Sequence, residues 1–349
     1  MTRNRAGSAP ARVSLLATLA TAIAALAHPV VAMAERAYVS NEDDGSVTVF
    51  DTARLQVIGT FQVGKRPRGL ALSRDAARLY VAITGLAKCP PPMPDEECAK
   101  HRDPSADGIA VVATAALTET GVFKGVSDPE RVALSHDGRA LLVTEEDSAQ
   151  LCVLDAARGS VIARIKVGRE PEGVRASPNG RYVVVTSESD NTVSIIDAAK
   201  YVLLRTVAVG KRPRDLAFSP DSHLAFVSGE GDASVYRVAL PSGSPSSQFV
   251  QLREEARPMG VVFDPKRGRL YVSTGHGRTV AVISAKDAAL LGEIQVGGRP
   301  WGIALAEGGA RLLAATGPSG TVAVIDTRTL TVVGKVRVGR GPWGVVVGP

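Results

Sequence analysis

A proline recurs through this chain at an almost constant spacing. The prolines are Pro67, Pro129, Pro171, Pro213, Pro258, Pro300 and Pro342, with successive gaps of 62, 42, 42, 45, 42 and 42 residues. The text around them also repeats, as in VGKRPRGLALS, VGREPEGVRAS and VGGRPWGIALA. A period near 42 with strand-like content indicates a repeat architecture, in which each unit packs on its neighbours. Most residues then serve the architecture, and function is expected where the repeats differ.

One repeat divides into four short strands. Within residues 171–210, runs that are apolar or alternating are separated by turn residues, and the predicted strands are 173–177, 182–186, 192–197 and 203–209. Four short antiparallel strands in about 42 residues are typical of one blade of a β-propeller. Seven prolines, and a length that fits seven units once the extra residues of the two longer gaps are set aside, predict an all-β, seven-bladed propeller.

The strand pattern at the two ends of the repeat region predicts how the ring closes. The segment AYVSNEDDGSVTVFDTA, from residue 37, reads as the second to fourth strands of a blade, whereas the final GPWGVVVGP reads only as a first strand. We therefore expect the C-terminal strand to pair with the N-terminal ones. Closure of this kind protects edges that would otherwise invite aggregation.

The first 34 residues have the features of an export signal. A basic stretch precedes an apolar run at 13–26, and Ala32-Met33-Ala34 fits a signal-peptidase site. The run is short for a membrane span, although an uncleaved anchor is the alternative. We expect a periplasmic, monomeric domain at 35–349 with no membrane span. Its formal charge falls from +6 to +3 on cleavage, which is too mild to indicate nucleic-acid binding.

The cysteines fit an oxidising compartment. Cys89 and Cys98 bracket a proline-rich insert within residues 85–107, and they are expected to form a disulfide. Cys152 lies in the apolar run LCVLD and is expected to be a buried free thiol.

The repeat text resembles a known family. The units AYVSNEDDGSVTVFDTARLQVIGTFQVGKRPRGLALS and RYVVVTSESDNTVSIIDAAKYVLLRTVAVGKRPRDLAFS resemble the YVTN-type β-propeller repeat over nearly all of residues 37–349. The export signal, the insert and the seven units are similar to a periplasmic subgroup associated with PQQ-dependent alcohol catabolism. That resemblance implies an accessory role beside a quinoprotein dehydrogenase, a cytochrome or a transporter component. It implies no cofactor and no catalytic residue.

Two other propeller classes fit the sequence poorly. The GH…WD signature of WD40 blades is absent. Quinoprotein dehydrogenases stack their blades with tryptophan motifs, and this chain has only Trp301 and Trp343. The chain therefore does not resemble the quinoprotein itself.

One face of the predicted ring gathers the charge variation. The connections from fourth to first strands are basic, the loops between second and third strands are acidic, and both should emerge on the face that carries the insert. The residue after each proline should stand at the channel mouth; in order, these are Arg68, Glu130, Glu172, Arg214, Met259, Trp301 and Trp343. A mouth that is half ionic and half aromatic suits a small amphiphilic molecule or the tip of a protein partner. The alternative is that these charges only pair with one another.

Two further departures from the repeat lie deeper in the channel. Arg175 replaces the small residue seen in other repeats, and Asp215 stands where most repeats have glycine. With Glu172 nearby, they form either a structural cluster or a device that binds a carboxylate, because Arg suits bidentate contacts.

Signals for catalysis are weak. No His pair has metal-ligand spacing, and no C-x-x-C-H, G-x-S-x-G or phosphate-binding glycine motif occurs. The leading hypothesis is a non-enzymatic binding or scaffold propeller. The alternative is a lactonase or lyase that uses Glu130 and Glu172, which Arg68, Arg175 and Arg214 would neutralise. An adhesion module is a third interpretation, against which the lack of a stalk or Ser/Thr-rich linker argues.

Overall fold

The computed structural model describes residues 1–2, 7, 35–86, 97, 100, 102–244 and 246–349. The chain divides into two units, Met1–Met33 and Ala34–Pro349, and every strand belongs to the second unit. The predicted export signal and the predicted Cys89–Cys98 disulfide lie outside the described residues.

The second unit consists of seven four-stranded antiparallel sheets, as the repeat predicted. Blades 1 to 3 are, from the axis outward, β28(Pro342–Gly348)-β1(Arg36–Asn41)-β2(Ser46–Asp51)-β3(Gln56–Gln62), β4(Leu70–Leu72)-β5(Arg78–Ile83)-β6(Gly108–Ala113)-β7(Thr118–Phe123) and β8(Pro129–Leu134)-β9(Ala140–Glu145)-β10(Gln150–Asp155)-β11(Val161–Lys166). Blades 4 and 5 are β12(Pro171–Ala176)-β13(Tyr182–Ser187)-β14(Thr192–Asp197)-β15(Val202–Ala208) and β16(Pro213–Phe218)-β17(Leu224–Gly229)-β18(Ser234–Ala239)-β19(Ser246–Gln251). Blades 6 and 7 are β20(Pro258–Asp264)-β21(Arg269–Thr274)-β22(Thr279–Ser284)-β23(Leu290–Gln295) and β24(Pro300–Ala306)-β25(Arg311–Thr316)-β26(Thr321–Asp326)-β27(Thr331–Arg337).

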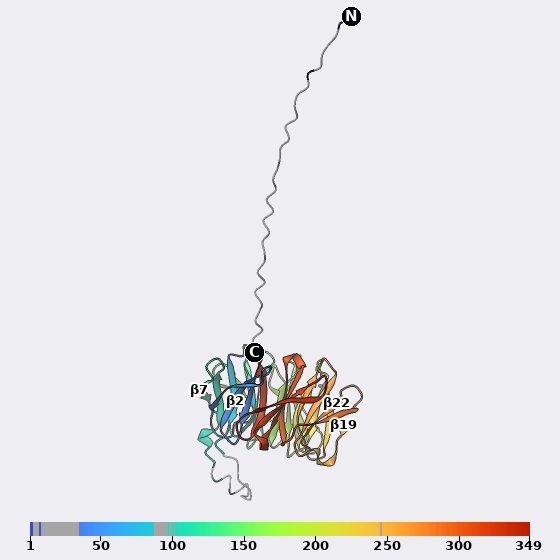
Figure 1. Ribbon diagram of the computed structural model, residues 1–349. Coiled ribbons are helices and arrows are strands. Elements are labelled where there is room, and N and C mark those ends of the chain that lie inside the picture. The colour runs from blue at the N-terminus through green and yellow to red at the C-terminus, as the bar shows by residue number, and fades with distance from the viewer. Residues whose placement is uncertain (3–6, 8–34, 87–96, 98–99, 101, 245) are drawn as a thin grey trace. The chain divides into compact units, whose positions relative to one another are not determined.

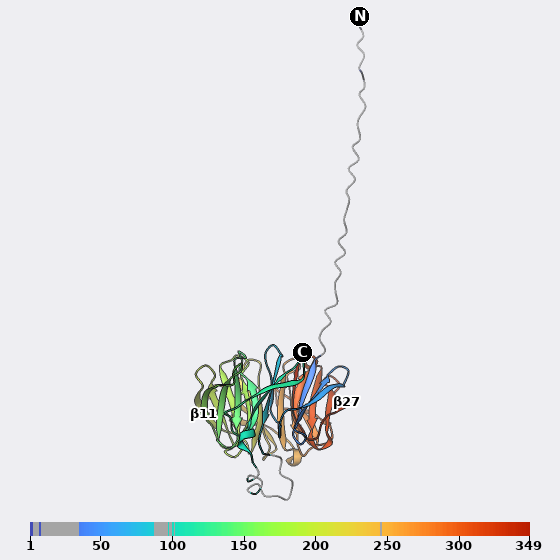
Figure 2. The same cartoon turned by 90° about the vertical axis from the view of Figure 1, so that its left-hand side faces the viewer.

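The blades follow one another around the ring in chain order (Figures 1 and 2). The first strands of neighbouring blades lie in contact at the axis. The short 3₁₀ helices of the described residues are η1(Pro104–Ala106), η2(Glu254–Ala256), η3(Glu307–Gly309) and η4(Gly317–Ser319). Among the same residues, no helix has the length and apolar character that a membrane crossing requires.

The ring closes as the strand pattern predicted. β28 pairs with β1 in antiparallel register, with Arg36 opposite Gly348 and Val39 opposite Val345. In Figure 1 the red C-terminal strand accordingly lies among the blue strands of blade 1. Blade 1 therefore joins the two ends of the repeat region.

Blade 4 illustrates why the repeat folds in this way. The second strand, YVVVTS, is buried throughout, the third is buried at its four central residues, and the fourth is largely exposed. The central strands pack between sheets, whereas the outermost strand covers one side only. The expected start of the first strand at residue 173 was wrong, because β12 begins at Pro171. A proline is tolerated at the first position of a strand, where its missing N–H breaks no regular ladder.

The cores between blades consist of small aliphatic side chains. Between blades 3 and 4, for example, Leu142 and Val153 pack with Val174 and Val185, and all four are buried. Cys152 is buried in the neighbouring core and is a free thiol, as expected. Burial raises the pKa of this thiol to about 12.

Glycine two residues after the proline lets the first strands approach closely. A Cβ on Gly302 would stand 2.6 Å from the carbonyl oxygen of Trp343, and a Cβ on Gly69 would stand 2.6 Å from the Cα atom of Arg131. Neighbouring backbones occupy these positions, so the clash has no flexible side chain to absorb it. The repeats that have glycine at this position therefore require it for packing.

We predict that Gly302→Ala destabilises the protein by about 1–3 kcal/mol, because overpacking at this site must move backbone. Gly292→Ala is the matched control, since a Cβ there has no other atom within 4 Å; it should change stability by about 0.5 kcal/mol or less. Urea unfolding followed by circular dichroism measures both. Equal effects of the two substitutions would contradict the packing role.

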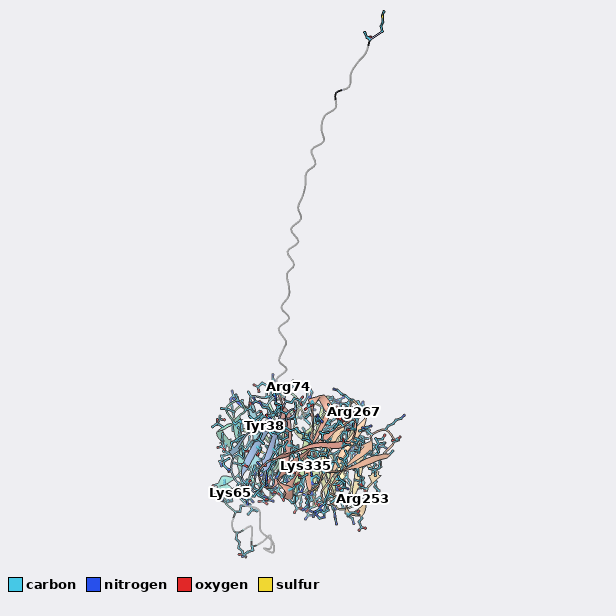
Figure 3. The ribbon with its side chains drawn as sticks, viewed as in Figure 1. Tyr38, Lys65, Arg74, Arg253, Arg267 and Lys335 are labelled. Carbon is cyan, nitrogen blue, oxygen red and sulfur yellow. The ribbon has the colours of Figure 1, made fainter. Side chains whose placement is uncertain are left out.

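The two ends of the ring differ in the loops that they carry. We call the connector face the end with the connections from fourth to first strands and the loops between second and third strands. The turn face carries the remaining turns. Figure 3 shows Lys65 and Arg253, from two connections, at one end, and Arg74 and Arg267, from two turns, at the other. The predicted division into two faces is thus present.

Candidate functional site

A cavity of about 330 Å³ lies at the channel mouth on the connector face. Its lining includes six of the seven residues that follow the repeated prolines, namely Arg68, Glu130, Glu172, Arg214, Trp301 and Trp343. The seventh, Met259, is buried, and its carbonyl oxygen accepts a hydrogen bond from the Ser228 hydroxyl at 2.5 Å. The structure therefore brings together most of the predicted mouth and places Met259 outside it.

Arg68 is a buried centre of positive charge that links three blades. Only 3 % of the residue is exposed. Its guanidinium lies 3.5 Å from the carboxylate of Glu42 in blade 1 and 3.2 Å from that of Glu146 in blade 3, and it also contacts Glu130 of β8. Glu42 is bound in addition by Arg66 at 2.8 Å.

Arg214 has the same role on the next part of the ring. It contacts Glu172 of blade 4 and Glu188 in the adjacent loop, and its Nε donates to Glu230 of blade 5 at 2.6 Å. Burial acts to lower the pKa of Arg214, but the three carboxylates together raise it. The guanidinium therefore remains charged and holds three acids from two blades.

These contacts decide how the charged mouth is built. The predicted alternative, in which the charges pair with one another, describes Arg68, Glu130, Glu172 and Arg214 as the structure places them. Buried ion pairs of this kind fix the geometry of their side chains, and removal of one partner lowers stability by several kcal/mol. The mouth is thus a rigid ionic rim.

Two carboxyl groups within this rim affect each other's ionisation. Glu172 and Glu188 both contact the guanidinium of Arg214. Burial, followed by the neighbouring Glu172, raises the pKa of Glu188 to about 8. Burial opposes ionisation of Glu172 as well, but Arg214 holds the pKa of Glu172 below its usual range. When two acidic groups lie close together, the pKa of one is commonly raised while the other stays ionised.

This pair predicts a specific pH dependence of stability. The pKa of Glu188 is raised from 4.5 to about 8 on folding, so between these values the folded protein holds a proton that the unfolded chain has released. Stability should therefore fall as pH rises through this window. In Glu188→Gln the stability should fall less steeply with pH, so that the stability of the variant relative to wild type increases between pH 5 and pH 9. Melting temperatures at unit pH intervals test this, with the exposed Glu254→Gln as control; parallel profiles for wild type and Glu188→Gln would refute it.

The other side of the mouth is aromatic. Trp301 and Trp343 meet edge to face with ring centroids 5.9 Å apart, and Arg299 stacks 5.4 Å from the centre of the Trp301 ring. Together with Pro318 and Pro342 they line a hollow of about 220 Å³. Aromatic and arginine side chains of this kind are frequent anchors at binding surfaces.

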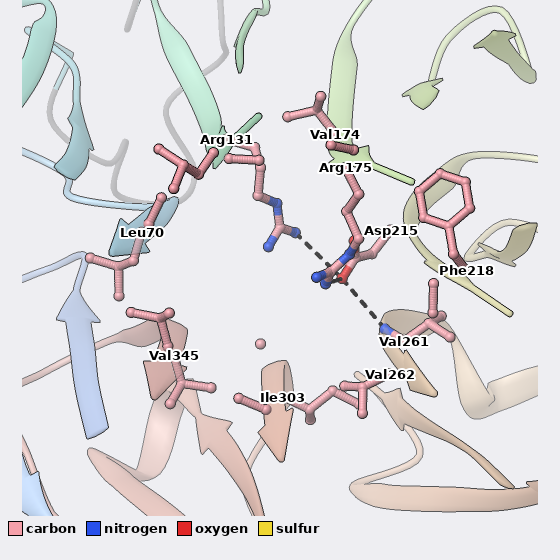
Figure 4. Close-up of a pocket in the computed structure, with 18 of the residues that line it drawn as sticks. Leu70, Arg131, Val174, Arg175, Asp215, Phe218, Val261, Val262, Ile303 and Val345 are labelled. Carbon is pink, nitrogen blue, oxygen red and sulfur yellow. Dashed lines mark hydrogen bonds and ion pairs between the residues drawn. The ribbon is translucent and has the colours of Figure 1, made fainter. Parts of the chain in front are cut away.

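A larger cavity, of about 610 Å³, occupies the channel lumen (Figure 4). The first strands of all seven blades line it, mostly with Val, Leu, Ile and Ala side chains. Its charged residues Arg131, Arg175 and Asp215 come from blades 3, 4 and 5. Arg175 pairs with Asp215 through Nε at 3.3 Å and Nη2 at 3.0 Å, and Arg131 lies 4.0 Å from the same carboxylate. The predicted Arg175–Asp215 pair is therefore present, and Glu172 belongs to the mouth instead.

Several of these residues were missed by sequence reasoning. Arg131 stands two residues after a repeated proline, where most repeats have glycine, so the signal that identified Asp215 could have found it. Glu42, Glu146, Glu188 and Glu230 were recognised as acidic loop residues but not as partners of the rim arginines. The lumen also reaches His136, Ser177 and Pro178 in turns of the turn face, so it opens away from the face on which binding was expected.

Within residues 35–86, 102–244 and 246–349, no three His, Cys, Asp or Glu side chains gather as a metal site would require. The carboxylates of the mouth are instead held by arginines.

Comparisons with known proteins identify the fold. No protein-family model and no curated protein matches the chain. Among solved structures, hydrazine synthase of Kuenenia stuttgartiensis is similar with a TM-score of 0.66 and 20 % identity, over 80 % of this chain and 88 % of that one. A protein of Lactobacillus plantarum gives 0.73 and 17 % over 91 % and 100 %. A proposed 6-phosphogluconolactonase of Bacteroides uniformis gives 0.69 and 16 % over 90 % and 99 %. At these identities the likeness concerns the seven-bladed propeller alone.

Proposed function

We propose that this protein is a non-enzymatic periplasmic binding propeller, accessory to PQQ-dependent alcohol oxidation or to an associated transport system. The observation that carries the proposal is the saturation of the mouth carboxylates. Glu130 is held by the buried Arg68, and Glu172 and Glu230 are held by the half-buried Arg214, so the rim offers a fixed surface rather than a free base beside bound water. A rigid surface of this kind suits recognition, because little is lost in ordering it on binding.

The resemblance implies the partner classes, and the chemistry of the connector face is compatible with the tip of a protein. Trp301, Trp343 and Arg299 form an aromatic anchor beside the ionic rim. A quinoprotein dehydrogenase, a cytochrome or a transporter component would place an apolar tip on the tryptophans and complementary charges over the rim.

Capture of the partner from the native periplasm tests this proposal. Tagged full-length protein, cross-linked and purified, should recover a protein of one of these classes by mass spectrometry. Trp301→Ala and Arg340→Glu on the connector face should reduce its recovery by at least about five-fold, since aromatic and charged anchors contribute most to such interfaces. Arg158→Glu on the turn face is the matched control, because Arg158 and Arg340 are exposed to 83 % and 78 % and each faces an aspartate. Loss of capture by the Arg158 variant alone would reverse the assignment of the face.

One observation favours a second candidate, a lactonase or lyase. The Glu172–Glu188 pair lies in the mouth cavity, and a carboxyl with a pKa of about 8 could exchange a proton near neutral pH. The fold is also shared with a proposed lactonase. Purified protein is assayed with lactones, with and without divalent ions. Turnover that Glu188→Gln abolishes would establish the enzyme in place of the binding protein.

A further inference from the structure

We propose that the lumen of the propeller binds a small carboxylate with an apolar body, which enters from the turn face and meets Arg131 and Arg175. The inference deepens the proposed binding function by naming a ligand class. It concerns a cavity different from the mouth that would receive a protein partner.

Three departures from the repeat converge on one place. Arg131 and Asp215 occupy the position at which Gly69, Gly173, Gly260, Gly302 and Gly344 are required by close backbone approach. Arg175 occupies a position filled elsewhere by alanine or valine. The three residues come from consecutive blades, and Figure 4 shows Arg131 and Arg175 directed toward Asp215 within the lumen. The architecture alone supplies no reason for charge at these positions.

The charges of the cluster do not balance. Among the residues that the structure describes around the lumen, two guanidinium groups face one carboxylate, and that carboxylate is engaged by Arg175. Asp215 also accepts from the backbone N–H of Leu216 at 2.8 Å. Arg131 is left with Asp215 at 4.0 Å, and its buried Nε has no hydrogen-bond partner among the described residues. Burial lowers the pKa of Arg131, with Asp215 opposing that effect. The side chain of Arg131 is 20 % exposed, but its Nε is buried, and a buried donor of a cation is costly to leave without an acceptor.

Arg131 is held in place for such a contact. Its guanidinium carbon lies 4.8 Å from the centre of the Trp343 ring, so the tryptophan supports one side of the guanidinium plane. Stacking orients the donors without using them, and a planar guanidinium then matches a carboxylate through two hydrogen bonds. Glu172 also acts on Arg131 electrostatically, but it is engaged by Arg214.

The remaining lining determines the body of the ligand. Val132, Val174, Val261, Ile303 and Val345 surround the cluster, and the cavity of about 610 Å³ is within the usual size range for small-molecule sites. His136, Ser177 and Pro178 mark its opening on the turn face. An alkyl or aryl carboxylate satisfies both the charge and the apolar wall, whereas inorganic anions would satisfy the charge alone.

The probes are sodium hexanoate and sodium benzoate, titrated into full-length protein and followed by calorimetry and by fluorescence. The chain has two tryptophans, and one of them, Trp343, stacks on Arg131, so binding should change the emission. Hexanoate should bind at least about 10-fold more tightly than 1-hexanol or hexylamine, because only the carboxylate completes the charge pairing. Equal affinity for hexanoate and 1-hexanol, or no binding of either carboxylate up to about 20 mM, would overturn the proposal.

Variants separate a ligand site from a structural cluster. Arg131→Gln should weaken hexanoate binding at least about 10-fold. If this variant does not fold, the same measurement is made on Arg131→Lys, which keeps the charge but loses the bidentate contact. Asp215→Asn should strengthen binding, because it releases Arg175 from its carboxylate; a merely structural cluster would show no such gain. Arg158→Gln, an exposed arginine of the turn face, is the control. If Arg131→Gln and Asp215→Asn leave the affinity for hexanoate unchanged, the proposed site is refuted. That result would not refute the proposed binding function, which the capture experiment on the connector face tests separately.

Discussion

Deletion of residues 342–349 is expected to cause the largest loss of stability. β28 supplies the first strand of blade 1, and Trp343 is buried. Without it, the backbone groups of β1 that pair with β28 lose their partners, and the first strands of blades 7 and 2, which contact β28, lose a neighbour. The loss should exceed the roughly 0.5–3 kcal/mol of an ordinary substitution, and the exposed edge should promote aggregation. Thermal unfolding and size-exclusion chromatography measure both effects.

The control restores the strand at a different point of the chain. Gly348 lies opposite Arg36, so residues 342–349 can be placed before Glu35 and joined through a short Asn-Gly turn. This rearranged chain should recover most of the stability, since blade 1 again has four strands, which are now consecutive in the sequence. If the truncated protein melts at the wild-type temperature, or if the rearranged chain is no better than the truncated one, blade 1 does not close the ring in solution.

Arg214→Ala is expected to have the second largest effect, a loss of about 3–5 kcal/mol at pH 7, because it leaves buried acids without their cation. Glu172 and Glu230 would then lie close together with much of their positive counter-charge removed. A sequence-based interpretation of Arg214 as an exposed anchor would predict almost no change in stability. Urea unfolding distinguishes the two results.

Arg212→Ala is the matched control for this prediction. Arg212 contacts the same Glu188 and Glu230, but its side chain is 52 % exposed, compared with 17 % for Arg214. Exposed ion pairs contribute about 0–1 kcal/mol. The double variant Arg214→Ala/Glu172→Gln should regain part of the loss, since Arg214 lowers the pKa of Glu172 and the glutamine carries no charge that needs this cation. Comparable losses for the two arginines would show that the rim is not an electrostatic unit.

The fold could be predicted from the sequence because the same pattern of strand and turn residues recurs in seven units. Each unit gives turn residues, alternation and the proline at a fixed place, so the four strands of blade 4 were placed to within two residues. Ring closure followed from the split of one unit between residue 37 and Pro342. The start of the first strand shows the largest error, two residues, since Pro171 was interpreted as the end of a connection.

The site was less predictable because its contacts join residues that are distant in sequence. Sequence position placed Arg68 and Arg214 at the mouth but could not tell that each lies among three glutamates from neighbouring segments. It could not tell that these contacts bury Arg68 and half-bury Arg214, since exposure depends on how far the loops fold over the rim. The lumen depends on the same information: Arg131 and Asp215 are 84 residues apart, and only the curvature of the ring brings them together.

The glycine at the second position after five of the seven repeated prolines limits how such a channel can change. Where a neighbouring backbone already occupies the place of a Cβ, no single substitution can introduce a new side chain without cost. The residues two positions further on, Ala71, Ala133, Ala217 and Ala304, line the lumen and leave room for longer side chains. Longer side chains can therefore be introduced into the lumen at these four alanines, one blade at a time, without disturbing the glycines at which neighbouring backbones meet.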